Sequence, residues 1–185
     1  MVEGHGDVKA VPILVSRIAS ELYSVHYVEV PPPYRVRRNR LLSELPKAVM
    51  IQATRSESRG GVLVIADADD DCAVELAQQL REAAAPTPIE VAIAVREFEA
   101  WFLGAVESLR AHRAVRDKAT FDGDPERLGG AKGHLAALMT ESYRETLHQP
   151  AFAALMDLAS ARRVRSFEHL VGCVGRLLGP SSPQR

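Results

Sequence analysis

A cluster of acidic residues follows a short, unbroken apolar run near the middle of this 185-residue chain. The run is Val62–Ala66 (VLVIA), and directly after it come Asp67, Asp69, Asp70 and Asp71. Like charges packed this closely repel one another, and a pair about 5 Å apart costs roughly 1 kcal/mol in water and several times more at a protein surface. A bound divalent cation would remove that cost, and carboxylate oxygens at D-x-D spacing suit Mg²⁺ or Mn²⁺. The cluster therefore predicts a metal site, with capping of the next helix by Asp70 or Asp71 as the structural alternative.

Two other acidic motifs can be compared with this spacing. An EF-hand loop starting at Asp67 would need glycine at its sixth position and glutamate at its twelfth, where this chain has Cys72 and Gln78. A haloacid-dehalogenase-like phosphatase has an apolar strand followed by D-x-D, and VLVIADAD matches that fragment. In such enzymes, however, the strand comes first in the domain and a second acidic pair follows far downstream. The EF-hand is excluded, and the phosphatase stays as a weaker alternative.

A second candidate motif, VEGHGD, lies near the start of the chain. Glu3 would end a first strand, and Gly4 and Gly6 would let a ligand or a neighbouring strand approach the backbone. On its own this motif is weak, because a solvated glutamate in a glycine turn is equally common. In a sheet of strand order 2-1-3-4, however, the first and third strands are neighbours. Glu3 would then meet Asp67 and Asp69 at the topological switch point.

The elements that must position these residues alternate between helix and strand. Apolar spacing over the first hundred residues predicts helices at 8–22, 41–53, 72–85 and from 98 onward, and strands at 25–30, 62–66 and 89–95. This alternation predicts an α/β fold, with a parallel sheet covered by helices on both faces. After residue 111 only helices are expected, at 125–128, 131–142, 150–162 and 166–178. We therefore expect an α/β core at 1–110 and a helical C-terminal region at 111–185 packed on it as one structural domain.

Composition excludes several classes of protein. Apolar residues make up 46% and charged residues 25%, as in globular proteins with a real core. The 23 basic and 24 acidic residues give a net charge of −1, which excludes a uniformly basic nucleic-acid binder but not a local basic patch. Two cysteines exclude a disulfide framework and a four-cysteine zinc site. No apolar run reaches the 18 residues of a membrane span, and the start lacks a signal-peptide pattern, so a cytoplasmic location is expected.

Taken together, the two acidic motifs resemble those of a Toprim domain, the metal-binding fold shared by topoisomerases, bacterial primases and OLD-family nucleases. More closely, the blocks VEGHGDVKAVPIL, VLVIADADDDC, AVREFEAWF and GAKG resemble the bacterial domain-of-unknown-function 4276 family, which has a Toprim-like core. The resemblance implies a Mg²⁺ site formed by Glu3, Asp67 and Asp69, with Asp71 as a further ligand, and phosphodiester chemistry. Only Met1 and Val2 precede Glu3, so we expect a truncated first strand, or a recorded start downstream of the true one.

Four more residues could join the site: Arg96, Glu97 and Glu99 directly after the last predicted strand, and Lys132 further along the chain. Glu99, in REFEAWF, either favours the dipole of its helix or serves as an additional metal ligand or orienting carboxylate, as could Glu97. Arg96 could contact phosphate or pair with the acids. GGAKG lacks the P-loop pattern, and its Lys132 could neutralise a phosphate or the carboxylates, or simply be solvated.

Two arginine patches balance the acids: Arg35, Arg37, Arg38 and Arg40, and Arg162, Arg163 and Arg165. Each patch could bind a nucleic-acid backbone with modest, salt-sensitive affinity, or be solvated or contact a partner protein.

The favoured hypothesis is a metal-dependent phosphodiesterase of Toprim type, preferably a nuclease. Asp67 and Asp69 would hold one or two Mg²⁺ or Mn²⁺ ions, and Glu3 would complete the metal shell or act as general acid or base. Lys132 or an arginine would offset developing negative charge. The alternative, from the family resemblance, is a non-catalytic or regulatory Toprim-like module that acts with a partner ATPase.

Overall fold

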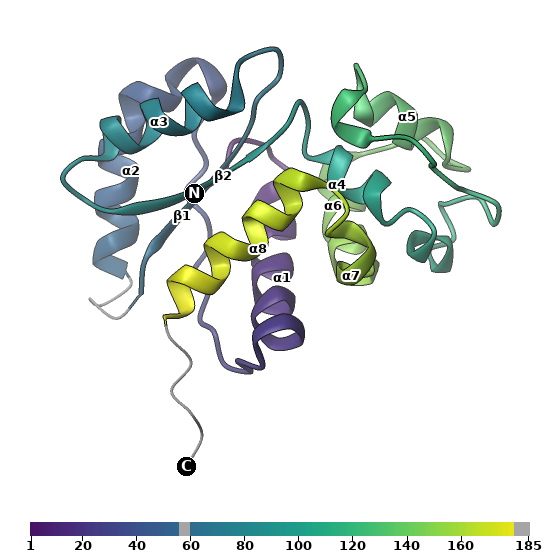
Figure 1. Cartoon of the computed structure of the whole chain (residues 1–185), viewed down its shortest axis with the longest axis horizontal. Coiled ribbons are helices and arrows are strands. Elements are labelled where there is room, and N and C mark those ends of the chain that lie inside the picture. The colour runs from purple at the N-terminus through teal and green to yellow at the C-terminus, as the bar shows by residue number, and fades with distance from the viewer. Residues whose placement is uncertain (56–59, 180–185) are drawn as a thin grey trace.

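The centre of the computed structural model, which describes residues 1–55 and 60–179, is a small parallel sheet (Figure 1). Strand β1 (Val62–Asp67) pairs with β2 (Ile89–Ala94) in parallel, from Val62 opposite Ile89 to Asp67 opposite Ala94. Helix α3 (Ala73–Ala84) connects the two strands. Both strands lie where their apolar runs predicted them, and an α/β fold with a parallel pair is confirmed.

The start of the chain extends this sheet along the other edge of β1. The amine of Met1 donates to the carbonyl of Leu63 (2.6 Å), and the N–H of Ile65 donates to the carbonyl of Met1 (3.0 Å). Val2 in turn forms a parallel bridge with residues 34–36. The backbone segments therefore lie side by side in the order 34–36, 1–2, β1 and β2. The first strand is reduced to the bridge at Val2, as its length predicts.

The prediction of a strand at residues 25–30 is wrong. These residues adopt no regular structure, and residues 34–36 take the place of the second parallel segment. The alternation in VHYVEV does not reflect burial, because Tyr27 is 98% exposed. The prolines at 31–33 cannot donate backbone hydrogen bonds, so pairing with the start of the chain begins only after them.

Helices cover both faces of the sheet (Figure 1). On one face lie α1 (Asp7–Arg17) and α8 (Arg165–Leu178), in a hydrophobic cluster that includes Ile65, Ala92 and Ala94. On the other face lie α2 (Leu41–Arg55) and α3, in a second cluster with Val62, Val64, Ala66, Val91 and Ile93. Successive side chains of a strand point to opposite faces, so an unbroken apolar run supplies both clusters.

Four short helices gather beside the sheet at the ends of the strands: α4 (Glu99–Gly104), α5 (Ala131–Ala137), α6 (Glu145–Leu155) and α7 (Leu158–Ala161) (Figure 1). Single-turn elements complete the described chain at Ile18–Leu22, Arg38–Arg40, Ser108–Ala111 and Pro125–Arg127. Helix α6 packs along α1, where Arg17 donates to the carbonyls of Ala153 (2.9 Å) and Met156 (2.8 Å) at its C-terminal end.

Two predicted helices of this part have different bounds. The helix predicted at 150–162 is two helices, α6 and α7, because the carboxylate of Asp157 caps a new start by accepting the N–H of Ser160 (2.7 Å). The helix predicted at 131–142 ends at Ala137, before Met139 bridges to Val115. Residues 180–185 of the predicted helical region lie outside the described residues. No helix in the described ranges is long and apolar enough to cross a membrane.

Candidate functional site

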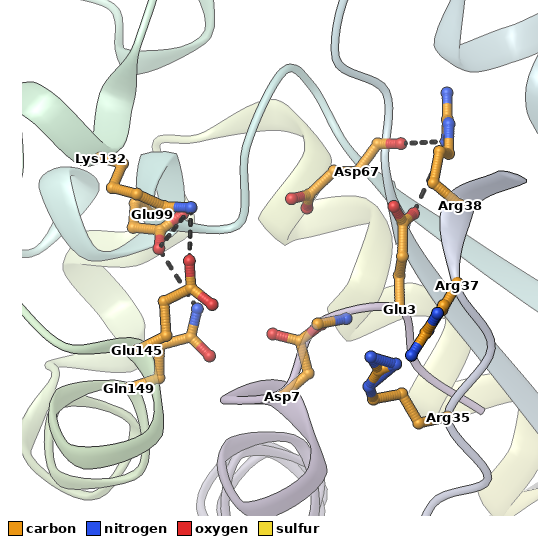
Figure 2. A pocket seen from close by; sticks show the side chains of 11 residues that line it. Glu3, Asp7, Arg35, Arg37, Arg38, Asp67, Glu99, Lys132, Glu145 and Gln149 are labelled. Atoms are coloured by element: carbon orange, nitrogen blue, oxygen red, sulfur yellow. Dashed lines mark hydrogen bonds and ion pairs between the residues drawn. The ribbon is translucent and has the colours of Figure 1, made fainter.

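A polar cavity of about 220 Å³ opens at the carboxyl end of β1, between the sheet and the neighbouring helices (Figure 2). Its lining comes from the glycine turn before α1, the segment around 35–38, the end of β1, and the helices α4, α5 and α6. The lining residues are Glu3, Gly4, Asp7, Arg35, Arg37, Arg38, Asp67, Glu99, Lys132, Glu145 and Gln149. The cavity therefore lies at the position where parallel α/β sheets bind their ligands.

The two glycines of VEGHGD shape one wall of the cavity. The N–H of Gly4 donates to Oδ2 of Asp7 (2.8 Å), and a Cβ on Gly4 would stand only 2.8 Å from that oxygen. A Cβ on Gly6 would come within 2.0 Å of Oε1 of Gln149. The glycines thus let Asp7 fold back onto the turn and let α6 approach α1, rather than admit a neighbouring strand.

Four carboxyl groups of the lining have raised pKa values. Burial is the main cause for Glu3, Asp7, Asp67 and Glu99. The pKa of Asp67 is raised furthest, because burial is reinforced by the negative charges of Asp7, Glu99, Glu3 and Asp69. Figure 2 shows Glu3, Asp7 and Asp67 between the arginines on one side and the Lys132 group on the other. These acids form an electrostatically unfavourable cluster that a proton or a cation would relieve.

Arg38 connects the acidic turn after β1, residues 69–71, with the segment before α2. Its guanidinium donates to the carbonyl oxygens of Asp67 (2.7 Å) and Ala68 (3.3 Å) and forms an ion pair with Asp71. The same group lies 3.6 Å from Oε2 of Glu3 and 3.9 Å from Oδ2 of Asp69. Sequence reasoning assigned Arg38 to phosphate, whereas here it neutralises acids and holds the end of β1.

A second group of polar side chains forms the opposite wall. Glu99, which is 1% exposed, accepts hydrogen bonds at Oε1 from the hydroxyl of Tyr143 (2.9 Å) and from Nε2 of Gln149 (3.3 Å). Nζ of Lys132 lies 4.0 Å from the same oxygen and 2.6 Å from Oε1 of Glu145. Burial lowers the pKa of Lys132, but the hydrogen bond to Glu145 and the nearby acids outweigh it, and the pKa is raised. Lys132 therefore stays protonated.

Two buried oxygens of the lining have no hydrogen-bond donor among the described residues, Oε2 of Glu3 and Oε1 of Gln149. Unpaired buried acceptors are costly, and a hard cation prefers carboxylate and amide oxygens as ligands. The donor set therefore fits Mg²⁺ or Mn²⁺. As the side chains stand, however, no three Asp, Glu, His or Cys residues within 1–55 and 60–179 converge closely enough to hold a metal ion. Binding of a metal ion by these acids would require their side chains to rotate.

The remaining predicted site residues lie outside the lining. Asp69 and Asp71 are on an exposed turn, with side chains 57% and 66% exposed. Arg96 pairs with Asp70 (2.7 Å) rather than facing the cavity. Asp69 and Arg96 both have positive φ, at 50° and 67°, and are joined by a backbone hydrogen bond of 2.9 Å. The second aspartate of D-x-D therefore lies on the turn outside the lining, while the first lies in it.

Sequence reasoning missed three residues of the lining: Asp7, Glu145 and Gln149. Asp7 is the first residue of α1, where an acid is expected to stabilise the helix dipole. Glu145 and Gln149 are four residues apart on α6, so they share one face of that helix. That polar spacing is the signal in the sequence, but nothing local indicates that α6 packs on α1. Glu97, considered as a ligand, instead accepts the backbone N–H of Lys132 (2.8 Å).

Comparison with known proteins gives one result. The family model described as a domain of unknown function (DUF4276) matches residues 2–174. The match includes every residue that lines the cavity. No curated protein and no solved structure matches the chain.

Proposed function

We propose that this chain, which belongs to the domain-of-unknown-function family DUF4276, is a Mg²⁺- or Mn²⁺-dependent phosphodiesterase with a Toprim-like core, acting as a nuclease. The observation that carries the proposal is the cluster of Glu3, Asp7 and Asp67, three acids with raised pKa values at the carboxyl end of β1. The backbone order 34–36, 1–2, β1, β2 supports the Toprim-like part, because it corresponds to the strand order 2-1-3-4.

Glu3, Asp7 and Asp67 would hold the cation, and Glu99 is the nearest acid on the opposite wall. A bound divalent cation would polarise the phosphate and lower the pKa of a water molecule. In the alternative role, Glu3 would not bind the cation, and its carboxylate would accept a proton from the attacking water as a general base. Asp69 and Asp71, on the exposed turn, would act only indirectly, through Arg38.

The cationic side chains of the lining would stabilise the phosphate. Arg35 and Arg37 face the acids from one side and Lys132 from the other (Figure 2). Because Lys132 stays protonated, it suits electrostatic stabilisation of developing charge and not proton abstraction. In this proposal, acidic side chains would hold the cation and positively charged side chains would hold the phosphate.

One observation favours the second candidate, a non-catalytic module that acts with a partner ATPase. The guanidinium of Arg38 already supplies positive charge to Asp71, Glu3 and Asp69, so part of the acidic site is neutralised without a metal. The phosphatase alternative is less favoured, because it needs both aspartates of D-x-D in the cavity and Asp69 lies outside it.

A cleavage assay tests the proposal. The full chain is incubated with plasmid, single-stranded DNA and RNA in Mg²⁺ or Mn²⁺, alongside Asp67→Asn and the matched exposed variant Asp70→Asn. We expect metal-dependent cleavage by the unmodified chain and by Asp70→Asn, and a loss of about 100-fold in Asp67→Asn. Absence of metal-dependent cleavage with every substrate would overturn the proposal in favour of the non-catalytic module.

A further inference from the structure

No phenylalanine, tyrosine or tryptophan ring lines the cavity within the described residues. Among these residues the lining consists of Gly4 and side chains that are charged or carry an amide. Tyr143, which contacts the lining, turns its hydroxyl to Glu99 and stacks on His148, with centroids 5.7 Å apart and planes at 21°. Tyr34, beside the arginines, packs against the core under α2 and α3. Proteins that hold the bases of a single strand use exposed aromatic faces. Within the described chain the lining has no aromatic ring, and the exposed imidazole of His5 lies beside Arg35 but outside the lining.

The cavity does offer cationic donors that are free to bind an anion. The side chain of Arg37 is exposed and has no hydrogen-bond or ion-pair partner within the described residues. Among the residues that the structure describes, the side chain of Arg35 has one polar contact, with Nδ1 of His5 at 3.4 Å. Both contrast with Arg38, whose guanidinium is fully engaged by the turn after β1. A planar guanidinium matches two oxygens of a phosphate, so Arg35 and Arg37 form a binding position for one phosphate group.

Cationic side chains lie on two sides of the acids in the cavity. Figure 2 shows Arg35 and Arg37 on one side, the acids Glu3 and Asp67 in the middle, and Lys132 on the other side. A lone phosphate would need only one of the two cationic sides. Nζ of Lys132 donates one hydrogen bond, to Glu145, and an ammonium has three donors, so Lys132 can still contact a phosphate. Cations on both sides of an acidic centre suit consecutive phosphates, the central one of which would be held by the cation that the acids bind.

From this geometry we infer that the cavity takes only the sugar–phosphate backbone of one nucleic-acid strand and leaves the bases outside. Binding and cleavage are then independent of base identity. This inference rests on the proposed function for its substrate, but it concerns recognition and not catalysis. It can therefore be tested by binding alone.

The binding test compares three fluorescein-labelled oligonucleotides of equal length: oligo-dT, a mixed sequence, and a strand with consecutive abasic sites at its centre. Fluorescence anisotropy in Ca²⁺ measures affinity without cleavage. We expect the three dissociation constants to agree within about twofold, because phosphate contacts carry no base information. Arg37→Ala should weaken all three equally and lower the slope of log K against log salt by about 1. Arg165→Ala, an exposed arginine outside the cavity, is the matched control and should change neither quantity.

The outcomes separate this inference from the proposed function. A preference of about tenfold or more for strands that carry bases would overturn the inference, even if the protein cleaves DNA. Equal binding of the three strands without cleavage in Mn²⁺ would uphold the inference and contradict the nuclease. An equal loss in Arg165→Ala would move binding to the other arginine patch and overturn the inference. Full competition by deoxyribose 5-phosphate at the same concentration of phosphate groups would also overturn it, in favour of a small phosphoester.

Discussion

Replacing Asp67 by asparagine should stabilise the protein at pH 8 in the absence of divalent cations. Asparagine keeps the shape of the side chain but removes the charge that Asp7, Glu99 and Glu3 repel. Two unit charges about 5 Å apart interact by about 3 kcal/mol at an effective dielectric constant of 20. Because the cluster relaxes by rotation and partial protonation, we expect a gain of about 1–3 kcal/mol in the free energy of unfolding. For a chain of this size that corresponds to a rise of about 2–10 °C in Tm.

The dependence on pH follows from the direction of the shift. The pKa of Asp67 is well above its ordinary value of 3.8, so the native state binds a proton that the unfolded state has released. Stability from this group is complete below pH 3.8 and is lost as the pH rises through the raised pKa. The advantage of Asp67→Asn should therefore be largest at pH 8 and shrink as the pH is lowered towards 3.8.

Thermal unfolding from pH 5 to pH 8, with and without Mg²⁺, measures both effects. Added Mg²⁺ should raise the Tm of the unmodified chain, since a ligand of the native state at 100 times its Kd stabilises by about 2.7 kcal/mol. It should leave Asp67→Asn nearly unchanged. Asp70→Asn is the control, because Asp70 is exposed and its pair with Arg96 is worth about 1 kcal/mol at most. A lower Tm for Asp67→Asn at pH 8 would refute the repulsion described here.

Three further predictions concern the elements around the site. Gly6→Ala should lower Tm by at least about 5 °C, because its Cβ would stand 2.0 Å from Oε1 of Gln149 and 2.8 Å from the backbone carbonyl of Glu145, which cannot rotate away. Gly133→Ala, with no atom within 4 Å, should be neutral or stabilising, and equal effects of the two substitutions would contradict the close packing of α1 and α6. Trp101→Phe should lower the free energy of unfolding, measured in urea, by about 2 kcal/mol, because it leaves a small cavity and removes the indole donor of a buried serine hydroxyl. An unchanged free energy of unfolding would contradict this packing. Glu90→Gln should lower the free energy of unfolding by about 1 kcal/mol or less at pH 7 and leave it unchanged well below pH 4.5, because an arginine of α8 lowers the pKa of Glu90. A loss of stability that does not depend on pH would show that the charge of Glu90 is not the cause.

The parts of the fold that the sequence predicts well are those whose burial is visible locally. VLVIA is an unbroken apolar run and IEVAIAV is apolar except for Glu90, and each is a strand with helices on both faces. Glu3 and Asp67 were predicted to meet because strand order places their ends together, and both line the cavity. The segment at 25–30 misled because its alternation resembles a strand, while the residues that pair are those after the prolines, at 34–36.

The rest depends on contacts between distant residues. Glu145 and Gln149 reach the site only because α6 packs on α1, and no local pattern fixes that pairing across most of the chain. The second arginine patch shows the same limit. Arg163 donates to the carbonyls of Gly104 (2.8 Å) and Phe121 (2.8 Å), so this arginine joins loops of the protein. The sequence alone does not distinguish an arginine with such a structural role from one that binds phosphate.

The most direct test of the central claim is calorimetric titration of Mg²⁺ and Mn²⁺ into the metal-free protein, repeated in buffers of different ionisation enthalpy. The carboxyl cluster should bind the cation saturably. The number of protons released on binding should increase as the pH of the titration is lowered, because the pKa values of Glu3, Asp7 and Asp67 are raised. Asp67→Asn should lose at least about tenfold in affinity, and Asp70→Asn should bind as the unmodified chain does. Absence of saturable binding at millimolar cation, or undiminished binding by Asp67→Asn, would contradict the claim that this cavity is a metal site.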